Sequence, residues 1–181
     1  MKQAKNRIGF DRCLAGMAAI AVVSGCAGPI ESRAGIAGPA VSPAISLAVT
    51  ATAGQGGPGM AQAVAAVRQE LVRQGFRLAD DAALRVEVGL AEREATSALL
   101  AADGSVLSPI KKKRLLQDCA DRRHRLTIAV IPPKGPPRRA WAEENHCHGT
   151  VAESIQPLAV RAVAMLNDDP STAVRYRKGR D

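Results

Sequence analysis

The stretch "RHRLTIAVIPPKGPPRRAWAEENHCH", residues 123–148, predicts two antiparallel strands joined as a hairpin. Residues 123–131 and 138–148 carry strand-like apolar patterns, and "PPKGPP" between them forces the chain to turn. A turn centred between Lys134 and Gly135 sets Arg125 near Glu143, and it sets His124 near Glu144. Both are favourable cross-strand pairs, so they support a single register for the hairpin.

The N-terminus carries an export signal. Four basic residues and one acidic residue occupy the first twelve positions, and eleven uncharged, mostly apolar residues follow at 13–23. A basic region followed by a short apolar region is typical of a secretory signal peptide. The apolar run is too short to span a bilayer, which needs roughly 20 such residues. We therefore expect residues 1–25 to be removed.

The signal ends in "VSGC", residues 23–26, which resembles the lipobox of bacterial lipoproteins. The resemblance implies cleavage between Gly25 and Cys26, and acylation of Cys26 as the new first residue. Three acyl chains would hold the protein to the membrane, because one chain alone anchors only marginally. Ala27 follows where an Asp would indicate inner-membrane retention, so we expect the outer membrane, facing the periplasm. The alternative is an ordinary signal peptide with a coincidental cysteine.

The composition of the processed chain limits its partners. Removal of four basic and one acidic residue lowers the net charge from +8 to +5, which favours anionic neighbours such as lipid headgroups or lipopolysaccharide. Only Phe76, Trp141 and Tyr176 remain as aromatic residues. This scarcity argues against nucleic-acid binding, which relies on aromatic stacking. We expect no cofactor.

Two cysteines, Cys119 and Cys147, remain after processing and acylation. The hairpin register places them nearly opposite each other, offset by a bulge or a small slip. In an oxidising compartment such a pair predicts one disulfide. Two free buried thiols are the alternative.

The remaining pattern predicts a single two-layer domain. Residues 26–40 are expected to be a lipidated flexible tether, 41–170 the folded domain, and 171–181 a disordered basic tail. Within the domain we expect strands at 44–51 and 83–97, in addition to the hairpin, and helices at 60–74 and 154–167. The order β-α-β-β-β-α gives a four-stranded, mostly antiparallel sheet with two helices on one face, an α+β two-layer sandwich.

Two segments carry a resemblance to a family. These are "VRQELVRQGFRLADDAALRVEV" (67–88), a helix ending in Gly-Phe before an alternating strand, and "VRAVAMLNDDP" (160–170). With the lipobox, they resemble small bacterial outer-membrane lipoproteins that carry a two-layer α/β domain of unknown function. The element order is similar to that of the lipoprotein subunit of the lipopolysaccharide translocon. The resemblance implies a binding role in the cell envelope.

Two polar motifs are candidate sites. The run Lys111, Lys112, Lys113 and Arg114 would contact an anionic ligand or, alternatively, form a solvated loop. His146 and His148 lie on one face of a strand and form a weak metal-site candidate with His124 or Glu144, but ordinary strand-end histidines account for them better.

The sequence contains no recognisable catalytic triad order, phosphate loop or metalloprotease motif. We therefore expect no enzyme and no catalytic residue. The expected function is that of a non-catalytic binding module in cell-envelope maintenance or assembly, whose partner is another envelope protein. The alternative partner is an anionic glycolipid bound through residues 111–114.

Overall fold

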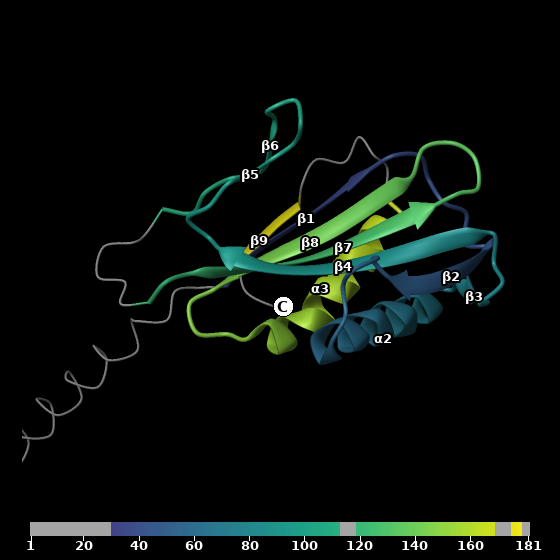
Figure 1. The fold of residues 1–181 in the computed structure, drawn as a ribbon, viewed down its shortest axis with the longest axis horizontal. Coiled ribbons are helices and arrows are strands. Elements are labelled where there is room, and N and C mark those ends of the chain that lie inside the picture. Colours follow the sequence, from purple (N-terminus) through teal and green to yellow (C-terminus); the bar gives the residue numbers. More distant parts are fainter. Residues whose placement is uncertain (1–29, 113–118, 169–174, 179–181) are drawn as a thin grey trace, which may run out of the picture.

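The computed structural model describes residues 30–112, 119–168 and 175–178 of the chain. These residues form one large sheet with two helices packed on one of its faces (Figure 1). The strands are β1 (Glu31–Ala37), β2 (Ser46–Ala51), β3 (Arg77–Leu78), β4 (Leu84–Glu94), β5 (Leu99–Leu100), β6 (Val106–Ser108), β7 (Arg122–Ile131), β8 (Arg138–His146) and β9 (Arg175–Lys178). The helices are α2 (Pro58–Arg73) and α3 (Val151–Met165).

The predicted mixed α/β fold with two helices and a sheet is confirmed, but the predicted size of the sheet is wrong. The sheet has seven strands in the order β3-β2-β4-β7-β8-β1-β9. The four predicted strands correspond to β2, β4, β7 and β8, which lie next to one another at its centre. β5 and β6 form a separate two-stranded hairpin that projects from the sheet (Figure 1).

Two of the additional strands correct the predicted domain boundaries. The predicted tether, 26–40, contains β1, which pairs antiparallel with β8 along its whole length. The predicted tail, 171–181, contains β9, which pairs with β1. The segment "ESRAGIA" shows little apolar pattern, because the inward residues include only Ala34 and Ile36 as apolar side chains. The predicted signal peptide and Cys26 lie outside the described residues.

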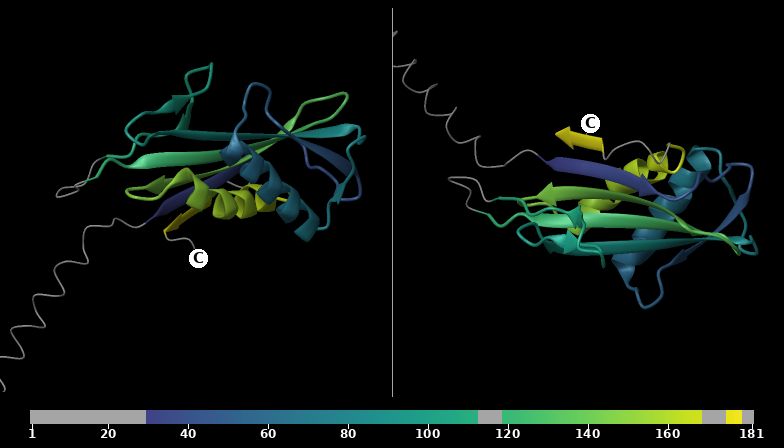
Figure 2. Two further views of the ribbon diagram at one scale, coloured as in Figure 1. Left: turned by 60° about the horizontal axis from the view of Figure 1, so that its bottom comes forward. Right: turned by 90° about the horizontal axis from the view of Figure 1, so that it is seen from above.

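The sheet is mostly antiparallel with one parallel corner. β2 pairs parallel with β4 and β3, and α2 makes the crossover that this parallel pairing requires. α2 and α3 pack side by side under the sheet (Figure 2). The core between the layers is aliphatic, built from residues such as Leu47, Val67, Val86, Ile128 and Leu158.

The predicted hairpin register is confirmed for both charged pairs. Arg125 lies opposite Glu143, and His124 lies opposite Glu144. Leu126 and Ile128 on β7 point toward the helices and are fully buried. Because side chains alternate along a strand, Arg123 and Arg125 must lie on the other face. This alternation positions the candidate site described below.

α3 begins three residues earlier than predicted because it has a complete capping box. Thr150 Oγ1 accepts a hydrogen bond from the Glu153 backbone N–H at 3.4 Å, and the Glu153 carboxylate accepts one from the Thr150 backbone N–H at 3.2 Å. Pro157 consequently lies in the second turn, where proline removes one helical hydrogen bond. No helix within the described residues is long and apolar enough to cross a membrane.

Replacing Thr150 with Ala should lower the free energy of unfolding by about 1 kcal/mol, because it removes the acceptor for one N–H at the start of α3. Thermal unfolding followed by circular dichroism should show a decrease in Tm of about 3 °C. Thr96→Ala, at an exposed threonine outside any helix, is the control and should leave Tm unchanged. Equal Tm values for the two variants would show that the cap does not stabilise α3.

Candidate functional site: the arginine clamp and the β5–β6 arm

The face of the sheet that the helices leave uncovered, called here the open face, carries a cluster of arginines from three strands. The register places residues of β1, β4, β7 and β8 in rows across this face. One row holds Arg33, Glu143 and Arg125, and the next holds Asn145, Arg123 and Arg93. Strand alternation therefore brings together side chains that are up to 110 positions apart in the sequence.

Glu143 is the carboxylate at the centre of this cluster. It is only 2% exposed, and each of its oxygens accepts a hydrogen bond from a guanidinium. Arg33 Nε donates to Oε2 at 2.8 Å, and Arg125 Nη1 donates to Oε1 at 2.7 Å. Arg93 lies 3.9 Å from Oε1. Such charge-assisted bonds offset the cost of burying the carboxylate.

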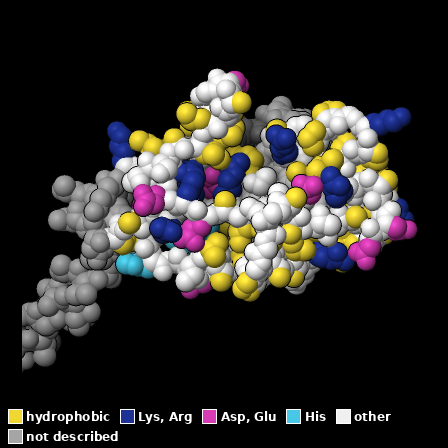
Figure 3. All heavy atoms as spheres, viewed as in Figure 1, with side chains coloured by type: hydrophobic (Ala, Val, Ile, Leu, Met, Phe, Trp, Pro, Cys, Tyr) yellow, Lys and Arg dark blue, Asp and Glu magenta, His cyan; other side chains and the backbone are white. Residues whose placement is uncertain are grey.

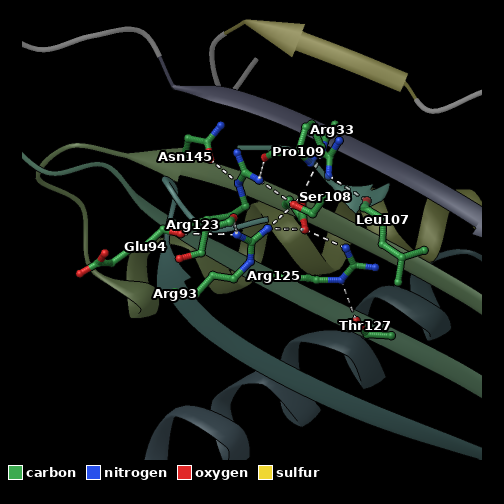
Figure 4. Close-up of polar contacts among 12 residues, drawn as sticks. Arg33, Arg93, Glu94, Leu107, Ser108, Pro109, Arg123, Arg125, Thr127 and Asn145 are labelled. Carbon is green, nitrogen blue, oxygen red and sulfur yellow. Dashed lines mark hydrogen bonds and ion pairs between the residues drawn. The ribbon is translucent and has the colours of Figure 1, made fainter. Parts of the chain in front are cut away.

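Ser108, at the end of β6, links the cluster to the projecting hairpin. Its fully buried hydroxyl donates to Glu143 Oε2 at 3.0 Å, and it accepts hydrogen bonds from Arg93 and from Arg123 Nη1, the latter at 2.6 Å (Figure 4). We call residues 97–110 the arm. We call Arg33, Arg93, Arg123, Arg125, Glu143 and Ser108 the arginine clamp.

The arginines also hold the backbone of the arm. Arg33 Nη2 donates to the carbonyl of Leu107 at 3.0 Å, and Arg123 Nη1 donates to the carbonyl of Pro109 at 2.5 Å. Arg93 donates to the carbonyl of Ser97 on the other side of the arm. The clamp thus holds the arm at its base, through the carbonyls of Ser97 before β5 and of Leu107 and Pro109 at the end of β6.

Trp141 packs beside the clamp on the open face. The guanidinium of Arg125 lies 4.4 Å from the centre of the indole, and that of Arg33 lies 5.3 Å from it. These are cation–π contacts. Gly35 makes room for the ring, because a Cβ there would lie 2.6 Å from an indole carbon. This close approach explains why a glycine occurs in the middle of β1.

The clamp holds four arginines and one glutamate, and its excess of positive charge contributes to the lowered pKa values of three of its residues. Burial acts to raise the pKa of Glu143, but hydrogen bonds and charges from Arg125 and Arg33 outweigh it, so the pKa lies below its ordinary value. Desolvation lowers the pKa of Arg93 and of Arg123, and the neighbouring arginines lower both further. Arginine nevertheless stays charged.

The arm held by this clamp exposes apolar side chains. Four of the six large hydrophobic residues exposed in the described part of the chain lie on it: Leu100 (54%), Val106 (60%), Leu107 (44%) and Ile110 (54%). Leu100 and Val106 face each other across β5 and β6. Exposed apolar side chains gathered on one projecting element are typical of an interaction surface.

The predicted basic run, Lys111–Arg114, is described only at its first two residues, and the first of these is ion-paired. Lys111 is engaged, since its ammonium lies 3.0 Å from Asp121 and 3.7 Å from Glu31, and its side chain is only 11% exposed. Contact of Lys111 with an anionic ligand therefore stays a prediction, and such a ligand would compete with these two carboxylates. Lys112 is exposed. Lys113 and Arg114 lie outside the described residues.

His146 belongs to a buried polar network under the sheet. His146 Nε2 contacts Glu144 Oε2 at 3.0 Å and Ser154 Oγ at 2.8 Å, and His124 Nδ1 contacts the same hydroxyl at 2.7 Å. The two imidazoles stack with centroids 4.9 Å apart. Arg161 Nη1 donates to Glu144 Oε1 at 2.6 Å. Desolvation lowers the pKa of His124, and the nearby His146 lowers it further.

The predicted metal candidates, His146 and His148, are not brought into one site. Among the described residues, the group of three metal-type side chains whose donor atoms converge is Cys119, Cys147 and His148. Both sulfurs of that group are joined in the predicted disulfide, with Cα atoms 5.6 Å apart. A disulfide offers no thiolate to a metal.

Ser154 and His146 do not form a catalytic relay. A triad needs the acid on one imidazole nitrogen and the hydroxyl on the other. Here Glu144 and Ser154 share Nε2 of His146, and Ser154 is fully buried. The network therefore joins α3 to the sheet. This network could not be predicted from the sequence, because Ser154 lies on α3 and meets β7 and β8 only in the folded chain.

Comparison with known proteins does not assign this chain to a family. No family model matches it, and no curated protein matches it. The solved structure of the PelC dodecamer from Paraburkholderia phytofirmans is 12% identical and covers 76% of this chain and 99% of that chain, with a TM-score of 0.46. A PDZ domain protein from Parabacteroides distasonis is 11% identical, covers 96% of this chain and 44% of that chain, and has a TM-score of 0.48.

Replacing Glu143 with Gln should lower the free energy of unfolding by about 3 kcal/mol, because it leaves four arginines without their central carboxylate. In the wild type, a carboxyl whose pKa is lower in the folded chain than its ordinary 4.5 contributes stability above pH 4.5, and this stability is lost as the pH falls below that value. Urea unfolding over an acidic pH series should therefore show a smaller loss for Glu143→Gln. Glu87→Gln, at a more exposed position on the same face, is the control.

His124 should make the folded chain sensitive to mild acid. Its folded pKa lies below the ordinary 6.5, so the unfolded chain takes up the proton first and stability is lost as the pH falls below 6.5. Urea unfolding between pH 6.5 and about 5 should show this loss in the wild type and a shallower one in His124→Gln, which does not titrate. Identical slopes would exclude His124 as the titrating group.

Proposed function

We propose that the chain is a lipoprotein of the bacterial outer membrane, anchored through acyl chains on Cys26 and facing the periplasm. Its folded domain is a non-catalytic binding module in cell-envelope maintenance or assembly. The "VSGC" motif supports the anchor, and the Cys119–Cys147 disulfide suits an oxidising compartment.

The observation that carries the binding role is the arm and the way it is held. Hydrophobic side chains on a projecting hairpin cost solubility unless they meet a partner. The chain nevertheless holds this hairpin with a partly buried cluster of four arginines around one buried carboxylate. An element held by several hydrogen bonds at its base has less conformational entropy to lose on association than a free loop, so the clamp favours binding through the arm.

The two partner classes expected from the sequence, an envelope protein and an anionic glycolipid, would contact different parts of the domain. Another envelope protein would cover the apolar side chains of the arm. An anionic glycolipid would contact the predicted basic run, but Lys111 is already paired with Asp121 and Glu31. We therefore place the binding surface on the arm and the adjoining open face.

Replacing Cys26 with Ser should release the protein from the membrane fraction into the soluble periplasmic fraction, because no acyl chains can be attached. Intact-mass analysis of the native protein should show a cleaved, acylated N-terminus. Cys13→Ser, within the predicted signal segment, is the matched control and should remain membrane-bound. An unmodified N-terminus on the native protein would contradict the proposed anchor.

A photo-crosslinker placed at Leu107 on the arm should capture a neighbour in intact cells. The same group at Val72, which is 58% exposed on α2, is the control and should capture none. Equal capture from the two positions would contradict the assignment of the binding surface to the arm.

A further inference from the structure

The base of the arm lies beside the point where the chain leaves for its lipid anchor. Lys111, which follows the arm directly, has its ammonium 3.7 Å from the carboxylate of Glu31, the first residue of β1. Glu31 comes five residues after Cys26. An extended chain of that length spans no more than about 18 Å, so the acyl chains must enter the membrane near the arm.

The open face next to the arm carries a positive charge excess. The register assigns six arginines and three glutamates to this face of β1, β4, β7 and β8: Arg33, Arg85, Arg93, Arg123, Arg125 and Arg139 against Glu31, Glu87 and Glu143. Figure 3 shows basic and acidic side chains lying among apolar ones on the face in view. A leaflet that contains anionic lipid attracts such a surface.

The side chains on this face also suit the membrane interface. The arm exposes Leu100, Val106, Leu107 and Ile110, and Trp141 lies on the sheet beside the clamp. Aliphatic side chains and tryptophan flanked by basic residues are characteristic of surfaces that lie in the headgroup region. Asp103 at the turn of the arm is exposed and ionised. A charged turn would stay out of the hydrocarbon region, so the arm would lie along the interface.

We infer that the open face and the arm dock on the anionic phospholipid surface of the same membrane that holds the acyl chains. This inference rests on the proposed function, and it names the partner of the proposed binding surface. In this orientation α2 and α3 face away from the bilayer. The lipid anchor supplies proximity, while the arm and the arginines fix which side of the domain meets the membrane.

The test uses the full mature chain with Cys26→Ser, so that acyl chains do not dominate binding. Vesicles of phosphatidylethanolamine with phosphatidylglycerol should bind this protein in flotation, and vesicles of phosphatidylcholine alone should not. Raising the salt concentration should weaken binding. Trp141 is the only tryptophan in the chain, so quenching of its fluorescence by brominated lipid reports directly on the open face.

Two pairs of variants separate the docking surface from the rest of the domain. Val106→Asp with Leu107→Asp should weaken vesicle binding at least about tenfold, whereas Val72→Asp on α2 should not. Arg139→Glu on the open face should weaken binding, whereas Arg68→Glu on α2, with the same change in charge, should not. Circular dichroism and Tm establish that each variant is folded.

Equal vesicle binding by the arm and helix variants, or unquenched Trp141 on bound vesicles, would overturn this inference. Absence of binding to phosphatidylglycerol vesicles would also overturn it. If the native protein is acylated and its arm crosslinks only to another protein, the docking inference fails and the proposed lipoprotein function stands. An unmodified native N-terminus would remove the proposed anchor, whatever the vesicles show.

Discussion

The pairing of Glu143 with the arginines around it is the interaction on which the open face depends. A buried carboxylate is costly, and four guanidinium groups close together repel one another. Each offsets the cost of the other because the pairing of β1, β4, β7 and β8 holds these side chains in one row or in neighbouring rows. Ser108 adds the arm to this arrangement through one hydroxyl. The contacts that hold the arm are therefore polar ones, and no residue of the arm belongs to the hydrophobic core.

The centre of the fold could be predicted from the sequence because its signals are local. Alternation in 83–97, the helical pattern before Gly75 and the proline-rich turn at 132–137 each depend on neighbouring residues. The turn was sufficient to give the pairing of Arg125 with Glu143. The edges could not be predicted, because β1 and β9 have weak patterns of their own and become strands by pairing with β8 and with each other.

The candidate site could not be predicted from the sequence for a related reason. The sequence pointed to Lys111–Arg114 and to His146 with His148, since runs and repeats are visible in one dimension. The clamp combines residues from four strands and the arm, and no spacing links Arg33 to Glu143 or Ser108. A glycine inside a strand often marks a close approach, but Gly35 could not be interpreted in this way because residues 26–40 were predicted to be a tether. Its partner, Trp141, emerges only from the β1–β8 register.

The pairing of β9 with β1 brings the two ends of the described chain together at one edge of the sheet. Lys178 lies opposite Glu31, so the last described strand runs beside the segment that follows the proposed acylation site. Under the proposed lipid anchor, a sequence that follows β9 would therefore begin on the side of the domain nearest the bilayer. Fusions placed instead in the turn after Pro132, at the far end of β7, would project away from that edge. The choice of attachment point thus decides whether a reporter crowds the lipid surface or leaves it free.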